Sequence, residues 1–341
     1  MDLYLQNLPE GKTLCVCEDD KLIFSSSGKW LHPLFELERF LSKQQPAGTL
    51  SAHDTAGGKA AAALMVRMGI KKVKFNLISK PAESFLENHG IAYSYDRQVE
   101  RLACMTETLL QDIDDLDEIY RLLRRKAKLV DGVIVKAEHL CLSFGPKKVL
   151  RDLNLEIGAG EPLLIIGENG AGKTTLLKIL LGQLQPDSGS LLIDGKLMKN
   201  LPSRMIGYIK QGTTAESFPM SVREVVEMGV DPTLSQEEKK FLIDTSLRRC
   251  GVAALTKRNY FSLSGGEQQK VSIARCLCQG ARLLLLDEPT SYLDESGRSE
   301  LVSLLQALTL DTMPTILCVS HDRQFQEELG WRTFRLEAPD A

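Results

Sequence analysis

Short, continuous apolar runs separated by helical patterns dominate the second part of the chain. The runs PLLIIG, RLLLLDE and TILCVS have the length of strands that are buried on both faces of a sheet. Two further segments, VIVKAEHLCLSF and VLRDLNLEI, alternate between apolar and polar positions, as strands with one buried face do. This succession of strands and helices predicts an α/β domain with a mixed or parallel sheet.

The first part of the chain shows a second, smaller set of elements. TLCVCEDDKLIFSSSGKW predicts a β-hairpin, and DTAGGKAAAALMVRMGI predicts a helix that follows a glycine pair. KKVKFNLIS predicts a strand, because Val73, Phe75 and Leu77 alternate with polar residues. An α/β domain is therefore expected here as well.

A charged segment, residues 108–128, separates the two parts. Its apolar residues recur at helical spacing, and its acidic residues precede its basic ones, an order that suits the helix dipole. The sequence predicts one continuous helix that closes the first domain, followed by a joint at Val130–Gly132. The expected domains are residues 1–130 and 131–341, in keeping with a length of 341 residues.

Composition and charge argue against some classes of partner and location. Hydrophobic residues make up 43%, charged residues 26%, and the net charge is -3, which gives no electrostatic reason to expect nucleic acid. The first twenty residues lack the pattern of a secretory signal, and no run of 18 apolar residues occurs. We therefore expect a cytoplasmic chain without a membrane span of its own.

Eight cysteines are present, but no CxxC pair that would suggest a zinc or redox site. Most lie inside apolar runs, so the sequence predicts buried, reduced thiols. Cys276 and Cys278 are two positions apart on a predicted helix and point in nearly opposite directions, so they are not expected to bind one ion together.

The segment GENGAGKTT carries the clearest chemical signal. It lies between a predicted strand and a predicted helix, and it matches the phosphate-binding pattern G-x-x-x-x-G-K-[ST]. Glycines let successive amides point at a triphosphate, and the following helix start adds positive potential. Lys173 is expected on the β- and γ-phosphates, and Thr174 on Mg²⁺. The complete set expected to bind nucleotide here is Gly167, Asn169, Gly170, Ala171, Gly172, Lys173, Thr174 and Thr175.

Two adjacent carboxylates, Asp287 and Glu288, end the run RLLLLDE. Ligands of open α/β sheets bind at the carboxyl ends of strands. Side-chain alternation predicts that the two groups point in different directions, so one can reach the metal and the other the attacking water. We assign Asp287 to Mg²⁺ and Glu288 to general-base catalysis. A solvated helix cap at Pro289 is the alternative.

Three further residues extend the predicted site. His321 follows the run TILCVS and is a candidate sensor of the γ-phosphate. Gln211, in YIKQG, is a candidate ligand of the metal or of the attacking water. Phe144, in LSFG, is a candidate for stacking on adenine, although single aromatic residues are more often part of a core.

A second glycine loop begins the predicted helix in SLSGGEQQKVSIARCL. Ser264, Gly265 and Gly266 supply a helix start and backbone donors, but no lysine and no metal ligand, so they form half of a site. The simplest completion is a head-to-tail homodimer in which this loop of one chain closes over ATP bound by the other.

Together these motifs resemble the nucleotide-binding subunits of ATP-binding cassette (ABC) transporters. The resemblance covers roughly residues 133–336 and includes the phosphate loop, Gln211, LSGGEQQKVSIAR, LLLLDEPTSYLD and SHD in the order of the family. It implies a P-loop ATPase domain with a helical subdomain that is bound at the inner face of the cell membrane. It also implies transmembrane permease subunits on separate chains.

Two details refine this resemblance. Glu267 stands where the family usually has glutamine, and we expect a modest change in the contact between chains rather than loss of activity. The segment SFPMSVREVVEMG resembles the coupling region of cassettes that serve metal-ion importers. A soluble ATP-dependent switch that acts on a non-membrane partner is the alternative function.

With CMTE at Cys104–Glu107, the hairpin, helix and strand of the first domain resemble, over about residues 10–115, a family of small uncharacterised bacterial proteins thought to share the three-layer cytidine-deaminase-like fold. We expect a regulatory or ligand-sensing domain. Zinc deaminases need H-x-E and P-C-x-x-C. Here His53-Asp54-Thr55 lacks the glutamate and Cys104 lacks a partner, so a nucleoside-modifying enzyme is not favoured. Asp54, Gly57, Gly58 and Lys59 at the predicted helix start could bind a small anion or a nucleotide, but a helix cap with close packing is the preferred interpretation.

Overall fold

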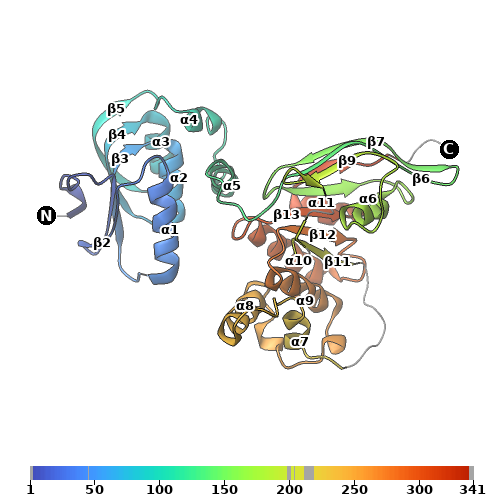
Figure 1. Ribbon diagram of the computed structural model, residues 1–341. Coiled ribbons are helices and arrows are strands. Elements are labelled where there is room, and N and C mark those ends of the chain that lie inside the picture. The colour runs from blue at the N-terminus through green and yellow to red at the C-terminus, as the bar shows by residue number, and fades with distance from the viewer. Residues whose placement is uncertain (1–2, 45, 198–200, 203, 211–218, 338–341) are drawn as a thin grey trace. The chain divides into compact units, whose positions relative to one another are not determined.

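The computed structural model describes residues 3–44, 46–197, 201–202, 204–210 and 219–337. The chain forms two compact units, Met1–Leu129 and Val130–Ala341. Each unit has its own sheet structure and its own buried core (Figure 1).

The first unit is built on a five-stranded sheet with the order β2-β1-β3-β4-β5. The hairpin of β1 and β2 is antiparallel, β1 is also antiparallel to β3, and β3, β4 and β5 run parallel. The predicted hairpin and the predicted strand are thereby confirmed. The strands are β1 (Leu14–Glu18), β2 (Lys21–Ser26), β3 (Leu50–Gly57), β4 (Lys72–Ser79) and β5 (Ala92–Val99).

Helices that pack on one another supply the rest of the core of this unit. The predicted glycine-led helix is α2, and it packs against α3 and α5. Its face toward the core includes Met65, which is completely buried, as is Phe75 of β4. The helical elements are η1 (Leu3–Leu5), α1 (His32–Gln44), α2 (Lys59–Arg67), α3 (Lys80–Asn88), α4 (Met105–Leu109) and α5 (Leu116–Lys126).

The prediction of one helix over residues 108–128 is wrong, because the chain forms α4 and α5 with a break between them. The Asp115 carboxylate accepts a hydrogen bond from the Glu118 amide at 2.7 Å and starts α5 as its N-cap. Aspartates compete for backbone amides and favour helix starts over helix interiors, so the acidic segment ends one helix and begins the next.

The second unit contains two sheets. A four-stranded antiparallel sheet has the order β10-β9-β6-β7, and a five-stranded parallel sheet has the order β11-β12-β13-β8-β14. All five strands predicted from the runs are present. The bounds are β6 (Val135–Phe144), β7 (Lys147–Ile157), β8 (Pro162–Ile166), β9 (Ser188–Ile193), β10 (Lys196–Leu197), β11 (Ile206–Ile209), β12 (Leu283–Asp287), β13 (Thr315–Val319) and β14 (Arg332–Arg335).

The parallel sheet is buried on both faces, as the continuous runs predict. In β12, Leu284 and Leu286 belong to the core cluster that includes α9 and α10, whereas Leu283 and Leu285 belong to the cluster that includes α6. The elements α7, α8 and α9 pack on one another and form the predicted helical subdomain (Figure 1). The helices are α6 (Lys173–Leu180), α7 (Val222–Glu227), α8 (Gln236–Arg249), η3 (Ala253–Leu255), η4 (Tyr260–Ser262), α9 (Gly265–Cys278), α10 (Glu295–Leu308) and α11 (Arg323–Leu329).

The cysteines are free thiols. Most are buried, including Cys276 and Cys278, but Cys104 is exposed and Cys141 is half-buried, so the expectation of burial is wrong for these two. Burial raises the pKa of the Cys250 thiol to about 12. Within the described ranges, no group of three or more His, Cys, Asp or Glu side chains could hold a metal ion. Every helix in those ranges falls short of the length and apolar character that crossing a membrane requires.

Candidate functional site

The carboxyl ends of three neighbouring strands carry the predicted site. In the parallel sheet β13 lies between β12 and β8, with Asp287 aligned to Val319 and Val319 aligned to Ile165. The phosphate loop follows β8, the two carboxylates end β12, and His321 follows β13. Parallel alignment therefore brings these segments to one edge of the sheet, where ligands of such sheets bind.

The loop after β8 has a backbone that requires glycine. Gly170 and Gly172 have φ values of 87° and 95°, in the left-handed region. A Cβ atom on Gly172 would lie 3.0 Å from the Val149 carbonyl oxygen, and one on Gly167 would lie 2.4 Å from that of Leu336. The loop thus curls tightly between β7 and the end of β14 before α6 begins at Lys173.

Lys173 is buried and its side chain folds back over this loop. Its Nζ donates hydrogen bonds to the Gly167 carbonyl at 2.7 Å and to the Glu168 carbonyl at 3.0 Å. Ala171 is also buried, Asn169, Gly170 and Thr174 are exposed, and Thr175 is half-buried. The ammonium group and the exposed loop backbone are therefore brought together, as a phosphate site needs.

Asp287 is buried at the end of β12, on the α6 face that it shares with Leu283 and Leu285. The Tyr208 hydroxyl of β11 donates to its Oδ2 atom at 3.2 Å. Burial raises the pKa of Asp287 and outweighs the opposing effects of this hydrogen bond and of the Lys173 charge. Burial also raises the pKa of Tyr208 to about 12, helped by the Asp287 charge, so the phenol stays protonated at neutral pH.

Glu288 turns away from the strand direction. Its φ of 47° lies in the left-handed region, which costs energy for a residue with a side chain. The Glu288 Oε2 atom lies 2.7 Å from His321 Nδ1 and accepts the His321 backbone N–H at 3.3 Å. Asp287 and Glu288 do point in different directions, but the expectation that strand alternation causes this is wrong, because β12 ends at Asp287.

The glycine loop of α9 is organised by a capping box. Ser264 is the N-cap, and its hydroxyl accepts the Glu267 amide at 3.3 Å, while Glu267 Oε2 accepts the Ser264 amide at 2.8 Å. The hydrogen bonds that the Ser264 amide and the Ser264 hydroxyl donate to Glu267 Oε2 lower the pKa of this carboxyl, so it is ionised at neutral pH. Among the described residues, no hydrogen bond joins this loop to the loop after β8.

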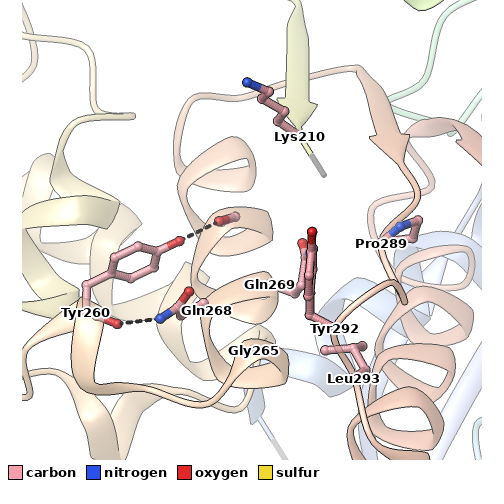
Figure 2. Close-up of a pocket in the computed structure, with 9 residues that line it drawn as sticks. Lys210, Tyr260, Gly265, Gln268, Gln269, Pro289, Tyr292 and Leu293 are labelled. Carbon is pink, nitrogen blue, oxygen red and sulfur yellow. Dashed lines mark hydrogen bonds between the residues drawn. The ribbon is translucent and has the colours of Figure 1, made fainter. Parts of the chain in front are cut away.

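A pocket of about 460 Å³ lies between α9 and the loop after β12 (Figure 2). Gly265, Gln268 and Gln269 line it from α9, and Tyr292 lines it from the loop. Lys210, at the end of β11, also lines it. The start of α9 and the segment that precedes Gln211 therefore line the same pocket.

Of the two remaining predicted site residues, the structure describes Phe144 but not Gln211. Phe144 ends β6 and is 51% exposed, so its ring is accessible for stacking. Gln211 lies outside the described residues. Tyr208 was missed by sequence reasoning: the only local signal was its place in the strand before Gln211, and its contact with Asp287 depends on strand pairing.

In the first unit, the glycine pair before α2 faces a carboxylate of the same chain. Glu107 is buried and accepts hydrogen bonds from the Ser79 hydroxyl, from the Leu102 amide at 3.2 Å and from the Lys59 amide at 3.4 Å. A Cβ atom on Gly58 would lie 3.0 Å from Glu107 Oε2. This arrangement agrees with the close packing of the preferred interpretation, but the N-cap residue Gly58 makes no side-chain cap, and Glu107 binds the Lys59 amide instead.

The motif residues next to that cap are also occupied by internal contacts. The Lys59 ammonium pairs with Asp114 at 2.7 Å, and the His53 ring contacts the Gln6 carbonyl at 2.8 Å and the Asn76 side chain at 2.7 Å. Burial raises the pKa of Asp54 to about 7. The resemblance of this unit to deaminase-like proteins remains a prediction.

The parallel sheet, the phosphate loop and the paired carboxylates together define the second unit as a P-loop ATPase. The ABC transporter family profile matches residues 150–291, and a profile for a domain of unknown function (DUF1893) matches residues 4–127. The chain belongs to the ATP-binding proteins of ABC transporters, and it binds and hydrolyses ATP as the ATP-binding subunit of such a transporter.

Two relatives and one solved structure illustrate the similarity. The chain is 38% identical to the hemin import ATP-binding protein HmuV of Bordetella avium, over 55% of this chain and 77% of the relative. It is 36% identical to the manganese transport ATP-binding protein MntB of Bacillus subtilis, over 57% and 79%. A dimeric ATP-binding cassette solved in a post-hydrolysis state with ADP and phosphate is 27% identical, with a TM-score of 0.52, over 60% of this chain and 97% of that one.

Proposed function

We propose that this chain powers the import of a metal ion or metal chelate through permease subunits on separate chains, at the inner face of the cell membrane. Relatives named for hemin and manganese import support this substrate class. The resemblance of the segment around α7 to the coupling region of metal-ion importers also supports it. The observation that carries the ATPase assignment is the Glu288–His321 contact at 2.7 Å beside Asp287 and the phosphate loop.

The loop after β8 binds the nucleotide. Its amides and the Lys173 ammonium bind the β- and γ-phosphates of ATP, which replace the Gly167 and Glu168 carbonyls as partners of Nζ. Phe144 stacks on adenine. The exposed positions of Asn169, Gly170 and Thr174 leave this surface open to the triphosphate.

The donor set at the sheet edge fits Mg²⁺, a hard cation that prefers carboxylate and hydroxyl oxygens. Asp287 supplies a buried carboxylate on the α6 face, and α6 carries Thr174 in its first turn. Thr174, Asp287 and Gln211 are assigned to hold the ion. When bound with ATP, Mg²⁺ neutralises charge on the β- and γ-phosphate oxygens.

Glu288 is assigned as the general base. The ring contact at 2.7 Å and the backbone N–H hydrogen bond at 3.3 Å from His321 both go to Oε2, so Oε1 is the atom that takes a proton from the attacking water. His321 holds this carboxylate in place and senses the γ-phosphate through its exposed ring. A base of this kind contributes roughly 10² to 10⁴ in rate.

The functional form is a head-to-tail homodimer. Ser264, Gly265 and Gly266 of one chain close over ATP held by the loop after β8 of the other, because the start of α9 offers amide donors without a cation. ATP then holds the two chains together, and its hydrolysis releases them.

Two substitutions test this site. Lys173→Ala removes the ammonium group and should abolish ATP turnover, whereas Glu288→Gln should bind ATP, fail to cleave it and accumulate as a dimer. Steady-state phosphate release and sedimentation with saturating ATP measure both effects. Near-normal turnover of Lys173→Ala, or a strictly monomeric Glu288→Gln protein, contradicts the assignment.

Transport is tested by capturing tagged Glu288→Gln protein from detergent-solubilised native cells in the presence of ATP. Co-purification of a polytopic membrane protein is expected, with Lys173→Ala as the matched control that does not form the ATP-bound state. Loss of uptake of radiolabelled manganese, iron or hemin in cells that carry only the Lys173→Ala protein identifies the substrate. A reproducible soluble partner without a membrane protein favours the alternative, a soluble ATP-dependent switch.

A further inference from the structure

Tyr208 donates a hydrogen bond to the proposed metal ligand Asp287. It lies on β11, where it is aligned with Leu285 of β12, so its side chain projects from the same face of the sheet as Leu285 and Asp287. Its hydroxyl donates to Asp287 Oδ2 at 3.2 Å. A donor on one carboxylate oxygen restricts rotation of the group and leaves the other oxygen free for a cation.

The strand that carries Tyr208 is held from its free edge. Because β11 is the edge strand of the parallel sheet among the described residues, its outer carbonyl groups face no further strand there. Instead, Gln279 donates to the Ile206 carbonyl at 2.9 Å and Arg275 donates to the Tyr208 carbonyl at 3.2 Å. Both carbonyls are bound by the carboxyl-terminal part of α9 and the residue after it.

The same helix begins at the Ser264–Gly266 loop, which is assigned to the ATP of the other chain. One rigid element therefore runs from that loop to the backbone of Tyr208, and the Tyr208 hydroxyl continues the connection to Asp287. A displacement of α9 would therefore move the Asp287 carboxylate. The motion would pass through the hydrogen bonds of Gln279 and Arg275 to β11 and through the Tyr208 hydroxyl.

We propose that Tyr208 is a positioning residue that orients Asp287 toward Mg²⁺, on a strand held in place by α9. This inference rests on the proposed function, since it takes Asp287 as the metal ligand. Partners that orient a metal ligand in this way typically change metal affinity or activity by about 10- to 100-fold when they are lost.

The test is Tyr208→Phe in the full-length chain, which removes one hydroxyl and keeps the ring. ATP affinity is measured by calorimetry in EDTA and again in a Mg²⁺ titration, in a Glu288→Gln background so that no turnover occurs. ATP affinity in EDTA should not change, whereas the Mg²⁺ concentration that gives half of the metal-dependent gain should rise about tenfold.

Tyr260→Phe is the matched control. Tyr260 is a half-buried tyrosine of the same unit, and its hydroxyl lies 3.3 Å from the Ser272 hydroxyl, so its loss should leave the Mg²⁺ titration unchanged. An unchanged titration for Tyr208→Phe overturns the inference. So does an equal loss of ATP affinity with and without Mg²⁺, because that result indicates general damage to the site.

Asp287→Asn distinguishes the metal assignment of Asp287 from the positioning role of Tyr208. If Asp287→Asn abolishes the gain from Mg²⁺ and Tyr208→Phe does not change it, only the positioning role fails. If Asp287→Asn keeps the full gain from Mg²⁺, the metal assignment of the proposed function fails, and the role of Tyr208 fails with it.

Discussion

At the scale of single residues, the departure from the ABC pattern at Glu267 has a specific physical meaning. The Glu267 carboxylate accepts the Ser264 amide and lies 3.0 Å from the Ser264 hydroxyl. These are the groups assigned to the triphosphate of the other chain. An ionised carboxylate therefore competes with phosphate for the same donors and repels it.

Glu267→Gln should favour the ATP-bound dimer. Glutamine can complete the same capping box, so the start of α9 is preserved while the negative charge is removed. An anion at a helix start is worth about 0.3 to 1 kcal/mol, so the ATP concentration at the midpoint of dimer formation should fall about two- to fivefold. Sedimentation against ATP concentration, in a Glu288→Gln background, measures this midpoint.

A matched control exists at the start of α7. Ser221 and Glu224 form the same capping box, and Glu224 lies outside the proposed ATP contacts. Glu224→Gln should leave the midpoint unchanged. A higher midpoint for Glu267→Gln would show that the carboxylate supports the contact between chains.

At the scale of elements, the spacing of apolar residues along the chain predicted most of the helices and strands. The strands came from continuous apolar runs, and α9 came from a glycine loop followed by helical spacing. The break between α4 and α5 was missed because helical periodicity continues through it. The choice at Asp115 depends on capping, which periodicity does not measure.

The attachment of α9 to β11 is another contact that hydrophobic periodicity does not predict. Gln279 Nε2 donates to the carbonyls of Arg204 at 3.0 Å and Ile206 at 2.9 Å. Gln279→Leu should lower the free energy of unfolding of the second unit by about 1 to 3 kcal/mol, because it leaves partly buried carbonyl groups without their donor.

Urea denaturation followed by Trp331 fluorescence measures this loss. Gln236→Leu, at an exposed position in the first turn of α8, is the matched control and should change stability little. Equal effects of the two substitutions would contradict a structural role for the Gln279 hydrogen bonds.

At the scale of the whole molecule, the two units can be followed separately, because each contains one of the two tryptophans, Trp30 and Trp331. We expect ATP to stabilise the unit that contains Trp331. Ligand at 100 times its dissociation constant contributes about 2.7 kcal/mol, so this transition should move to higher urea while the Trp30 transition stays in place.

Single-tryptophan variants, Trp30→Phe and Trp331→Phe, assign the two transitions. Lys173→Ala should remove the effect of ATP. A shift of the Trp30 transition with ATP would mean that the two units are coupled energetically.

The candidate site was predictable where its residues are close in sequence. Gly167–Thr175 and Asp287-Glu288 are local motifs, and their chemistry follows from residue type and spacing. The donor from Tyr208 to Asp287 and the role of Glu107 beside Gly58 were not predictable, since each depends on which segments the fold brings together.

The place of β8 in the sheet has a consequence for biosynthesis. β8 lies between β13 and β14, and the Leu336 amide donates to the Ile166 carbonyl at 2.8 Å, directly before the glycine loop. The ribosome makes the phosphate loop before β13 and β14, the two strands that flank β8. Pairings between segments so distant in sequence form slowly. A nascent chain therefore acquires a stable nucleotide site only after Leu336 has left the exit tunnel, which delays ATP-dependent pairing until both strands beside β8 have formed.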